Sequence, residues 1–120
     1  MLIEIKAPTT DLLGALYRDQ VFPPSTDVTG AIAQVLKYRE SFLSEHHSIT
    51  QGGAAGLVPG EPKCLVVIGC AEEQLTDDAR RRSFERFRER LTGVTVVTFD
   101  EVFRRVNDLI ELLERNSTEV

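Results

Sequence analysis

The sequence predicts an α/β domain in which helices flank a mixed β-sheet, and two observations carry this prediction. Short apolar or β-branched runs alternate with longer segments whose apolar residues recur at helical spacing. The chain has 120 residues, 42% hydrophobic and 28% charged, which is ordinary globular composition and enough for one core. Strand–helix alternation of this kind indicates one sheet covered by helices.

Three strands are expected, near residues 1–6, 63–69 and 94–98. In the first, Ile3 and Ile5 lie on one face and Glu4 and Lys6 on the other, so one of the two faces should be buried. The second contains a continuous apolar run, which is typical of a strand buried on both faces. The third is short and β-branched.

Three helices are expected, near residues 27–44, 78–91 and 100–114. Side chains that can cap a helix N-terminus precede or begin each segment. They are Ser25, Thr26 or Asp27 for the first, Thr76 or Asp77 for the second, and Asp100 for the third. A short helical turn is possible over 11–17, and residues 45–62 are expected to form a loop rich in Gly, Ser and His.

The domain organisation is expected to be simple. Residues 1–115 form one unit and 116–120 a flexible tail. Because the sequence opens inside a strand that carries charge on one face, we expect either that 1–115 is the C-terminal part of a larger domain or that a partner covers this strand. A second copy of the chain is one such partner, so a homo-oligomer is expected.

Composition restricts the class of protein. No apolar run approaches the roughly 18 residues of a membrane span, and no secretion signal is visible, so a cytoplasmic protein without a membrane partner is expected. Cys64 and Cys70 end one predicted strand about 20 Å apart, too far for a disulfide, and are expected to be small buried residues. The net charge of −5 alone points away from nucleic acid.

Glu4 and Lys6 are the first candidates for chemistry. Two residues apart on a strand, they share a face. A carboxylate in this position can ligate Mg²⁺, and a neighbouring ammonium can orient a water molecule and offset charge in a phosphate transition state. The alternative is an ordinary solvent-facing pair on an edge strand, because Glu-x-Lys is common by chance.

Gln34 and Tyr38 are the second pair. Four residues apart on the predicted helix after the Glu-x-Lys strand, they share one face. Alone, Tyr38 would be a core aromatic residue and Gln34 a boundary residue. The informative feature is the combination of both pairs, which we expect to gather in one cleft.

Other charged groups have simpler interpretations. A run of six arginines within 80–90 could touch phosphates, but their interleaving with Glu85 and Glu89 is more typical of a solvated, ion-paired helix face. His46 and His47 could bind a metal or transfer protons, or be a surface pair without a role. Asp100-Glu101 is interpreted as a helix cap with first-turn charge.

Four stretches together resemble the nuclease domain of the Shedu anti-phage defence family, within the PD-(D/E)XK nuclease superfamily. They are IEIKAPTTDLL, STDVTGAIAQVLKYRESF, CLVVIGC and VTVVTFDEV. The resemblance implies a restriction-endonuclease-like core that lacks its N-terminal strands, and a Mg²⁺- or Mn²⁺-dependent DNA endonuclease. Matched residue by residue, Glu4 is the metal-ligating acid, Ile5 lends its carbonyl to the metal, and Lys6 is the catalytic lysine.

The same resemblance implies that Gln34 and Tyr38 lie beside the active site and support DNA engagement. It also implies an acidic residue from a preceding strand, which has no counterpart here. The chain is therefore expected to be an incomplete endonuclease domain. The alternative is a catalytically inactive nuclease-fold module that serves interaction or assembly.

Overall fold

A three-stranded parallel sheet organises the chain. The computed structural model describes the backbone of residues 1–50 and 62–118 and the side chains of 1–45 and 62–117. The strands β1 (Leu2–Ile5), β2 (Cys64–Val67) and β3 (Val94–Val97) lie in the order β1-β2-β3. The predicted α/β class and strand positions are confirmed, but these three strands are parallel rather than mixed. A helical crossover joins each consecutive pair of strands. Such a connection returns the chain to the end of the sheet where the previous strand began, so the next strand runs parallel to it.

The predicted alternation of strands and helices is also observed. The helices are α1 (Thr26–Thr50), α2 (Ala71–Gln74), α3 (Asp78–Glu89) and α4 (Phe99–Thr118).

Helix bounds depart from the prediction in three places. α1 continues through 45–50, which were expected to be loop, and 51–61 of that loop lie outside the described residues. α4 continues to Thr118, into the expected tail, and α2 was not predicted. A stripe of apolar residues on one side marks only the helix turns that pack against the core. The length of a helix that extends beyond the core is therefore underestimated.

Serine and aspartate caps begin two of the helices. Ser25 precedes α1, and its Oγ accepts a hydrogen bond from the Val28 N–H at 3.1 Å. Asp77 precedes α3 and accepts from the Arg80 N–H at 2.8 Å. The predictions of a cap within 25–27 and of Asp77 as a possible cap are thus confirmed.

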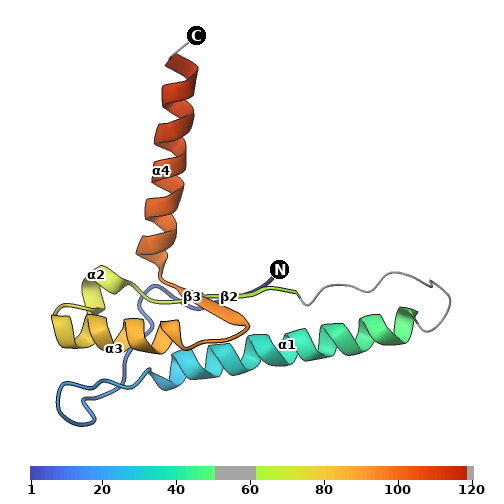
Figure 1. Cartoon of the computed structure of the whole chain (residues 1–120), viewed down its shortest axis with the longest axis horizontal. Helices are drawn as coiled ribbons and strands as arrows, with labels where there is room; N and C mark the ends of the chain where they lie inside the picture. The colour runs from blue at the N-terminus through green and yellow to red at the C-terminus, as the bar shows by residue number, and fades with distance from the viewer. Residues whose placement is uncertain (51–61, 119–120) are drawn as a thin grey trace.

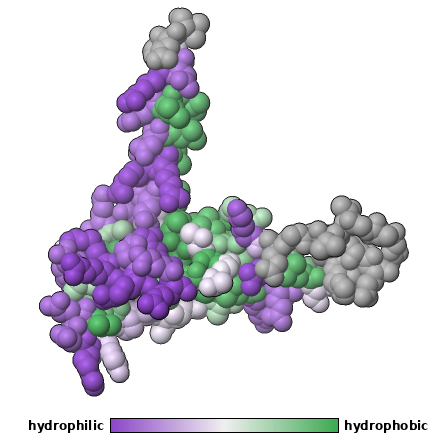
Figure 2. All heavy atoms as spheres, viewed as in Figure 1, coloured by the Kyte–Doolittle hydropathy of each residue, from purple (hydrophilic) through white to green (hydrophobic). Residues whose placement is uncertain are grey.

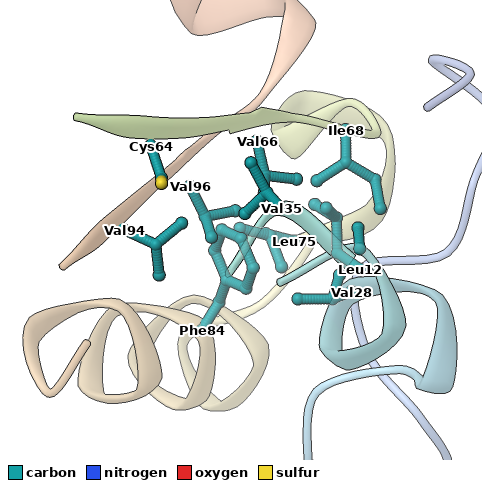
Figure 3. Close-up of a cluster of buried hydrophobic side chains, with 11 residues drawn as sticks. Leu12, Val28, Val35, Cys64, Val66, Ile68, Leu75, Phe84, Val94 and Val96 are labelled. Carbon is teal, nitrogen blue, oxygen red and sulfur yellow. The ribbon is translucent and has the colours of Figure 1, made fainter. Parts of the chain in front are cut away.

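Both long crossovers lie on the same face of the sheet, with α1 and α3 side by side beneath the strands (Figure 1). Right-handed connections between parallel strands in the order 1-2-3 require this arrangement. Phe84 of α3 is fully buried among Val35 of α1, Val66 of β2 and Val96 of β3 (Figure 3). The core therefore occupies one side of the sheet.

The opposite face is covered at Val67 and Val97, which are buried, but it is exposed at β1. Ile3 and Ile5 are 52% and 64% exposed, whereas Glu4 is turned toward the side covered by α1. The buried face of β1 is therefore the one with the charged residues. α4 leaves β3 and rises steeply from the sheet, with apolar side chains exposed along it (Figures 1 and 2). None of the described helices is long and apolar enough to cross a membrane.

The segment after β1 is a bridged loop, so the helical turn suggested for 11–17 is wrong. Antiparallel bridges join Leu13 to Pro24 and Arg18 to Val21. Asp19 and Gln20 have φ of 41° and 62°, as both central residues of a type I′ turn do. The backbone groups of this segment bond across the loop, and the chain reverses rather than coiling.

Candidate functional site

Glu4 and Lys6 lie together where β1 ends. Lys6 Nζ is 3.6 Å from Glu4 Oε1, and the side chains are 37% and 17% exposed, respectively. The prediction that they share a face is confirmed. Glu4 is also aligned with buried Val66, so its carboxylate lies at the margin of the core. In this half-sheltered position the carboxylate interacts more strongly with nearby charges than a fully solvated one does.

The backbone of Ile5 faces the open edge of the sheet. The N–H groups of Leu2 and Lys6 donate to β2 or the residue before it, at Lys63 O (2.8 Å) and Val67 O (2.9 Å). Peptide groups alternate in direction along a strand, so the Ile5 carbonyl points away from β2. Among the described strands nothing pairs with that edge.

Gln34 and Tyr38 contact each other on α1. Gln34 Nε2 donates to Tyr38 Oη at 2.8 Å, as expected of residues four apart on a helix. Arg39, on the opposite flank of α1, reaches the Gly93 carbonyl just before β3 at 3.5 Å. At 100° per residue, Gln34 and Tyr38 therefore lie on the flank turned toward β1.

The two pairs share one side of the molecule. α1 packs against β1 and β2, on the face of the sheet that carries Glu4. Within the described side chains, no hydrogen bond or ion pair joins the Gln34–Tyr38 pair to Glu4 or Lys6. That all four residues act in one cleft stays a prediction.

Gln74 is a polar residue that sequence reasoning missed. Its side chain accepts from the Leu12 N–H at 2.6 Å and donates to the Thr10 carbonyl at 2.8 Å. Both partners belong to the loop that follows Lys6, so Gln74 fixes the exit of β1. Gln74 and Leu12 are 62 residues apart in the sequence, and the unpredicted helix α2 places the Gln74 amide beside this loop. Local sequence gives no signal for such a contact.

A second polar cluster occupies the end of β3. Buried Thr98 donates its hydroxyl toward Asp100 Oδ1 (2.6 Å) or Glu101 Oε1 (2.9 Å), and its N–H donates to Glu101 Oε1 at 2.9 Å. Arg88 Nη1 donates to the same Glu101 oxygen at 2.6 Å. The predicted capping of α4 by Asp100-Glu101 is thus confirmed for Glu101, which accepts the Thr98 N–H.

Asp100 lies in the first turn of α4, as predicted, but it is not the cap that was expected for this helix. Its carboxylate accepts from the N–H groups of Ala71 (2.9 Å) and Glu72 (3.1 Å) and so caps α2, not α4. Cys70, which precedes α2, makes no side-chain cap. A carboxylate distant in sequence therefore satisfies these helix donors.

The charges of this cluster are mutually stabilised. Burial disfavours ionisation of both carboxyls, but it is outweighed. Bonds from Thr98, Ala71 and Glu72 hold the pKa of Asp100 below its usual value, and bonds from Arg88 and Thr98 do the same for the pKa of Glu101. Burial also opposes the charge on Arg88, but Glu101 and Glu85 raise its pKa.

A hollow of about 510 Å³ opens beside this cluster, between α2, α3 and α4. Three arginines and four carboxylates line it: Arg81, Arg88, Arg104, Glu72, Glu85, Asp100 and Glu101. Each arginine is paired with a carboxylate, and the lining carries no excess of positive charge. We assign the cluster to joining helices.

Two further expectations have mixed outcomes. Cys64 and Cys70 are both free thiols, but only Cys64 is fully buried. The side chains of His46 and His47 lie outside the described residues. Within the part of the chain whose side chains are described, no three His, Cys, Asp or Glu residues cluster as a metal-binding group.

Comparison of the sequence with known proteins places the chain in a family. The profile described as "Shedu protein SduA, C-terminal" matches residues 1–103. The chain belongs to the Shedu SduA C-terminal family. The Shedu protein SduA of Bacillus cereus (strain B4264) is 43% identical over an alignment 120 positions long, which covers 95% of this chain and 31% of the relative. The chain thus spans about a third of that relative's length.

The family match includes every polar group described above except Arg104. It begins before Glu4, contains Gln34 and Tyr38, and ends at Phe103, just after the Thr98–Glu101 cluster. The resemblance to the Shedu family found in the sequence is therefore confirmed. Most of the exposed length of α4 lies beyond the match.

Proposed function

We propose that this chain supplies the Glu-x-Lys half of a Mg²⁺- or Mn²⁺-dependent DNA endonuclease site in an anti-phage defence protein of the cytoplasm. The observation that carries the proposal is the Glu4–Lys6 pair, 3.6 Å apart at the end of β1. The Gln34–Tyr38 pair on the adjoining flank of α1 supports it. In this proposal the sheet and its two covering helices are part of a restriction-endonuclease-like core.

Each residue has a role that its position allows. Glu4 and the Ile5 carbonyl are oxygen donors, the type that Mg²⁺ prefers, and would hold the ion. When bound, a divalent ion supplies an activated water and offsets phosphate charge. Lys6 orients the attacking water and stabilises the negative charge that develops on the phosphate. Gln34 and Tyr38 contact the DNA beside the scissile bond.

One carboxylate and one carbonyl leave most positions around a divalent ion to water. Tight placement normally requires a second carboxylate, and small misplacement of reacting groups costs about 100-fold in rate. We therefore expect the 120-residue chain alone to cleave DNA poorly, and a longer or assembled form to cleave it efficiently.

The second candidate function is an inactive nuclease-fold module for interaction or assembly. The observation in its favour is the row of half-exposed apolar residues on α4, among them Phe103, Leu109 and Leu113 at 60%, 54% and 59% exposure. Apolar stripes of this kind usually face a partner. In this alternative Glu4 and Lys6 form an ordinary surface ion pair.

A plasmid-nicking assay with Mg²⁺ or Mn²⁺ separates the two candidates. It compares the protein that contains this chain, and the 120 residues alone, with Lys6→Ala and Glu4→Ala. Lys63→Ala is the control, because Lys63 is an exposed lysine outside the pair. We expect metal-dependent nicking by the longer form that falls at least about 100-fold in both site variants and persists in the control.

Nicking by the longer form that survives both site substitutions would rule out the proposed endonuclease site. Efficient nicking by the isolated chain would instead show that no second carboxylate is needed.

A further inference from the structure

The six arginines of the α3 region divide into two groups of three. Arg80 pairs with Asp77, Arg81 with Asp78 at 2.7 Å, and Arg88 with Glu85 and Glu101. The other three have no ion pair among the described side chains: Arg82, Arg86 and Arg90. The ion-paired interpretation of this helix is therefore correct for only half of its arginines.

The unpaired arginines form one stripe. Arg82, Arg86 and Arg90 are exposed and follow one another at four-residue intervals, so they lie along one side of the helix. Arg82 and Arg86 lie nearly opposite buried Phe84, and Arg90 follows on the same outer side. At a rise of 1.5 Å per residue the stripe is about 12 Å long. Figure 2 shows strongly hydrophilic atoms over α3.

The charge of this region differs from that of the chain. Residues 77–90 contain six arginines and four carboxylates, whereas the whole chain has 14 basic and 19 acidic residues. The ion pairs occupy the carboxylates at 77, 78 and 85, although Asp78 also attracts Arg82, and Glu89 has no ion pair among the described side chains. A locally basic surface on an acidic domain indicates an anionic partner.

We infer that the stripe formed by Arg82, Arg86 and Arg90 binds the phosphate backbone of duplex DNA. The inference rests on the proposed endonuclease function and adds to it a contact surface that lies apart from Glu4 and Lys6. Duplex DNA carries one negative charge per about 1.7 Å of helix axis, so a 12 Å row of guanidinium groups faces several phosphates at once. Such contacts position a duplex without reading its sequence.

Fluorescence anisotropy of a labelled duplex of about 20 base pairs tests this surface. The measurement is made in EDTA, so that cleavage plays no part. The stripe variant is Arg82→Gln/Arg86→Gln/Arg90→Gln. The control, Arg80→Gln/Arg81→Gln/Arg104→Gln, removes the same charge from three arginines that are already ion-paired.

We expect the stripe variant to bind at least tenfold more weakly than the unchanged chain at low salt. The slope of log K against log salt should fall in magnitude by about 2.7, or 0.9 for each lost phosphate contact. In the control variant, log K should decrease by less than a third of the decrease in the stripe variant. Circular dichroism verifies that both variants keep the native helix content.

Three results would overturn the inference: equal losses in the two variants, no loss in the stripe variant, or no DNA binding by the unchanged chain. Tighter binding to an RNA duplex of the same length would also overturn it. The Glu4→Gln variant separates this inference from the proposed function, because it should lose cleavage but keep binding. If binding depends on the stripe but the longer form does not cleave DNA, the DNA-binding surface is supported and the endonuclease function is refuted.

Discussion

The ends of β1 and β3 carry similar side chains in very different surroundings. At the end of β3, Glu101 accepts hydrogen bonds from Thr98 and Arg88, and Asp100 accepts from two N–H groups of α2. At the end of β1, by contrast, Glu4 has one ion-pair contact among the described side chains, at 3.6 Å with Lys6. The difference separates charges that hold the fold together from charges that the fold leaves available.

This contrast gives a criterion for function. A fully bonded polar cluster is explained by the helices that it joins, whereas a half-sheltered carboxylate and ammonium with one weak contact contribute little to stability. Glu4 and Lys6 therefore require another explanation, and ligand or substrate binding is the one that we propose. Four comparisons of variants or conditions test this contrast.

The largest loss of stability is expected for Glu101→Ala. This change leaves the mostly buried Arg88 with one carboxylate fewer and removes the acceptor for the Thr98 N–H, so the free energy of unfolding should fall by roughly 2–3 kcal/mol. Urea unfolding measures it, with the exposed Glu89→Ala as control. A loss below about 0.5 kcal/mol would show that the β3 cluster does not hold the helices.

A smaller loss is expected for Gln74→Ala. The substitution removes both hydrogen bonds to the loop after Lys6, so the free energy of unfolding should fall by about 1–2 kcal/mol. Hydrogen exchange of the Leu12 amide should accelerate more than exchange in α1. Unchanged protection of Leu12 would mean that Gln74 does not fix this loop.

The pH dependence of stability should reflect the β3 cluster. The pKa values of Asp100 and Glu101 are lowered in the fold, so their contribution is complete above the values of the unfolded chain and is lost as pH falls through the lowered values. The urea concentration at the unfolding midpoint should therefore decrease as the pH is lowered below about 4. Asp100→Asn should show a shallower fall, and an identical pH profile would refute this assignment.

Much of the fold was predictable from local patterns. Alternation marked β1, apolar or β-branched runs marked β2 and β3, and spacing with caps marked α1, α3 and α4, because these signals arise within a few residues. The parallel pairing, the tight turn at 18–21 and α2 were not predictable in this way. They depend on contacts between distant segments, as the capping of α2 by Asp100 illustrates.

For the candidate site, the sequence predicted the two residue pairs but not how they are arranged relative to the rest of the fold. Spacing placed Glu4 beside Lys6 and Gln34 beside Tyr38, because strand and helix periods fix such neighbours. Spacing did not reveal which face of β1 is covered, since that depends on the crossover of α1. Nor did it separate the paired from the unpaired arginines of α3, because those pairs depend on side-chain conformation and on Glu101 of another helix.

The most direct test of the contrast is the free energy of unfolding of the double variant Glu4→Gln/Lys6→Met. Partly exposed ion pairs contribute about 0–1 kcal/mol, so we predict a value within about 1 kcal/mol of that of the unchanged chain. This would be the smallest effect of the series and would leave the pair without a structural explanation. A loss as large as that of Glu101→Ala would contradict the account, because the β1 pair would then hold the fold as the β3 cluster does.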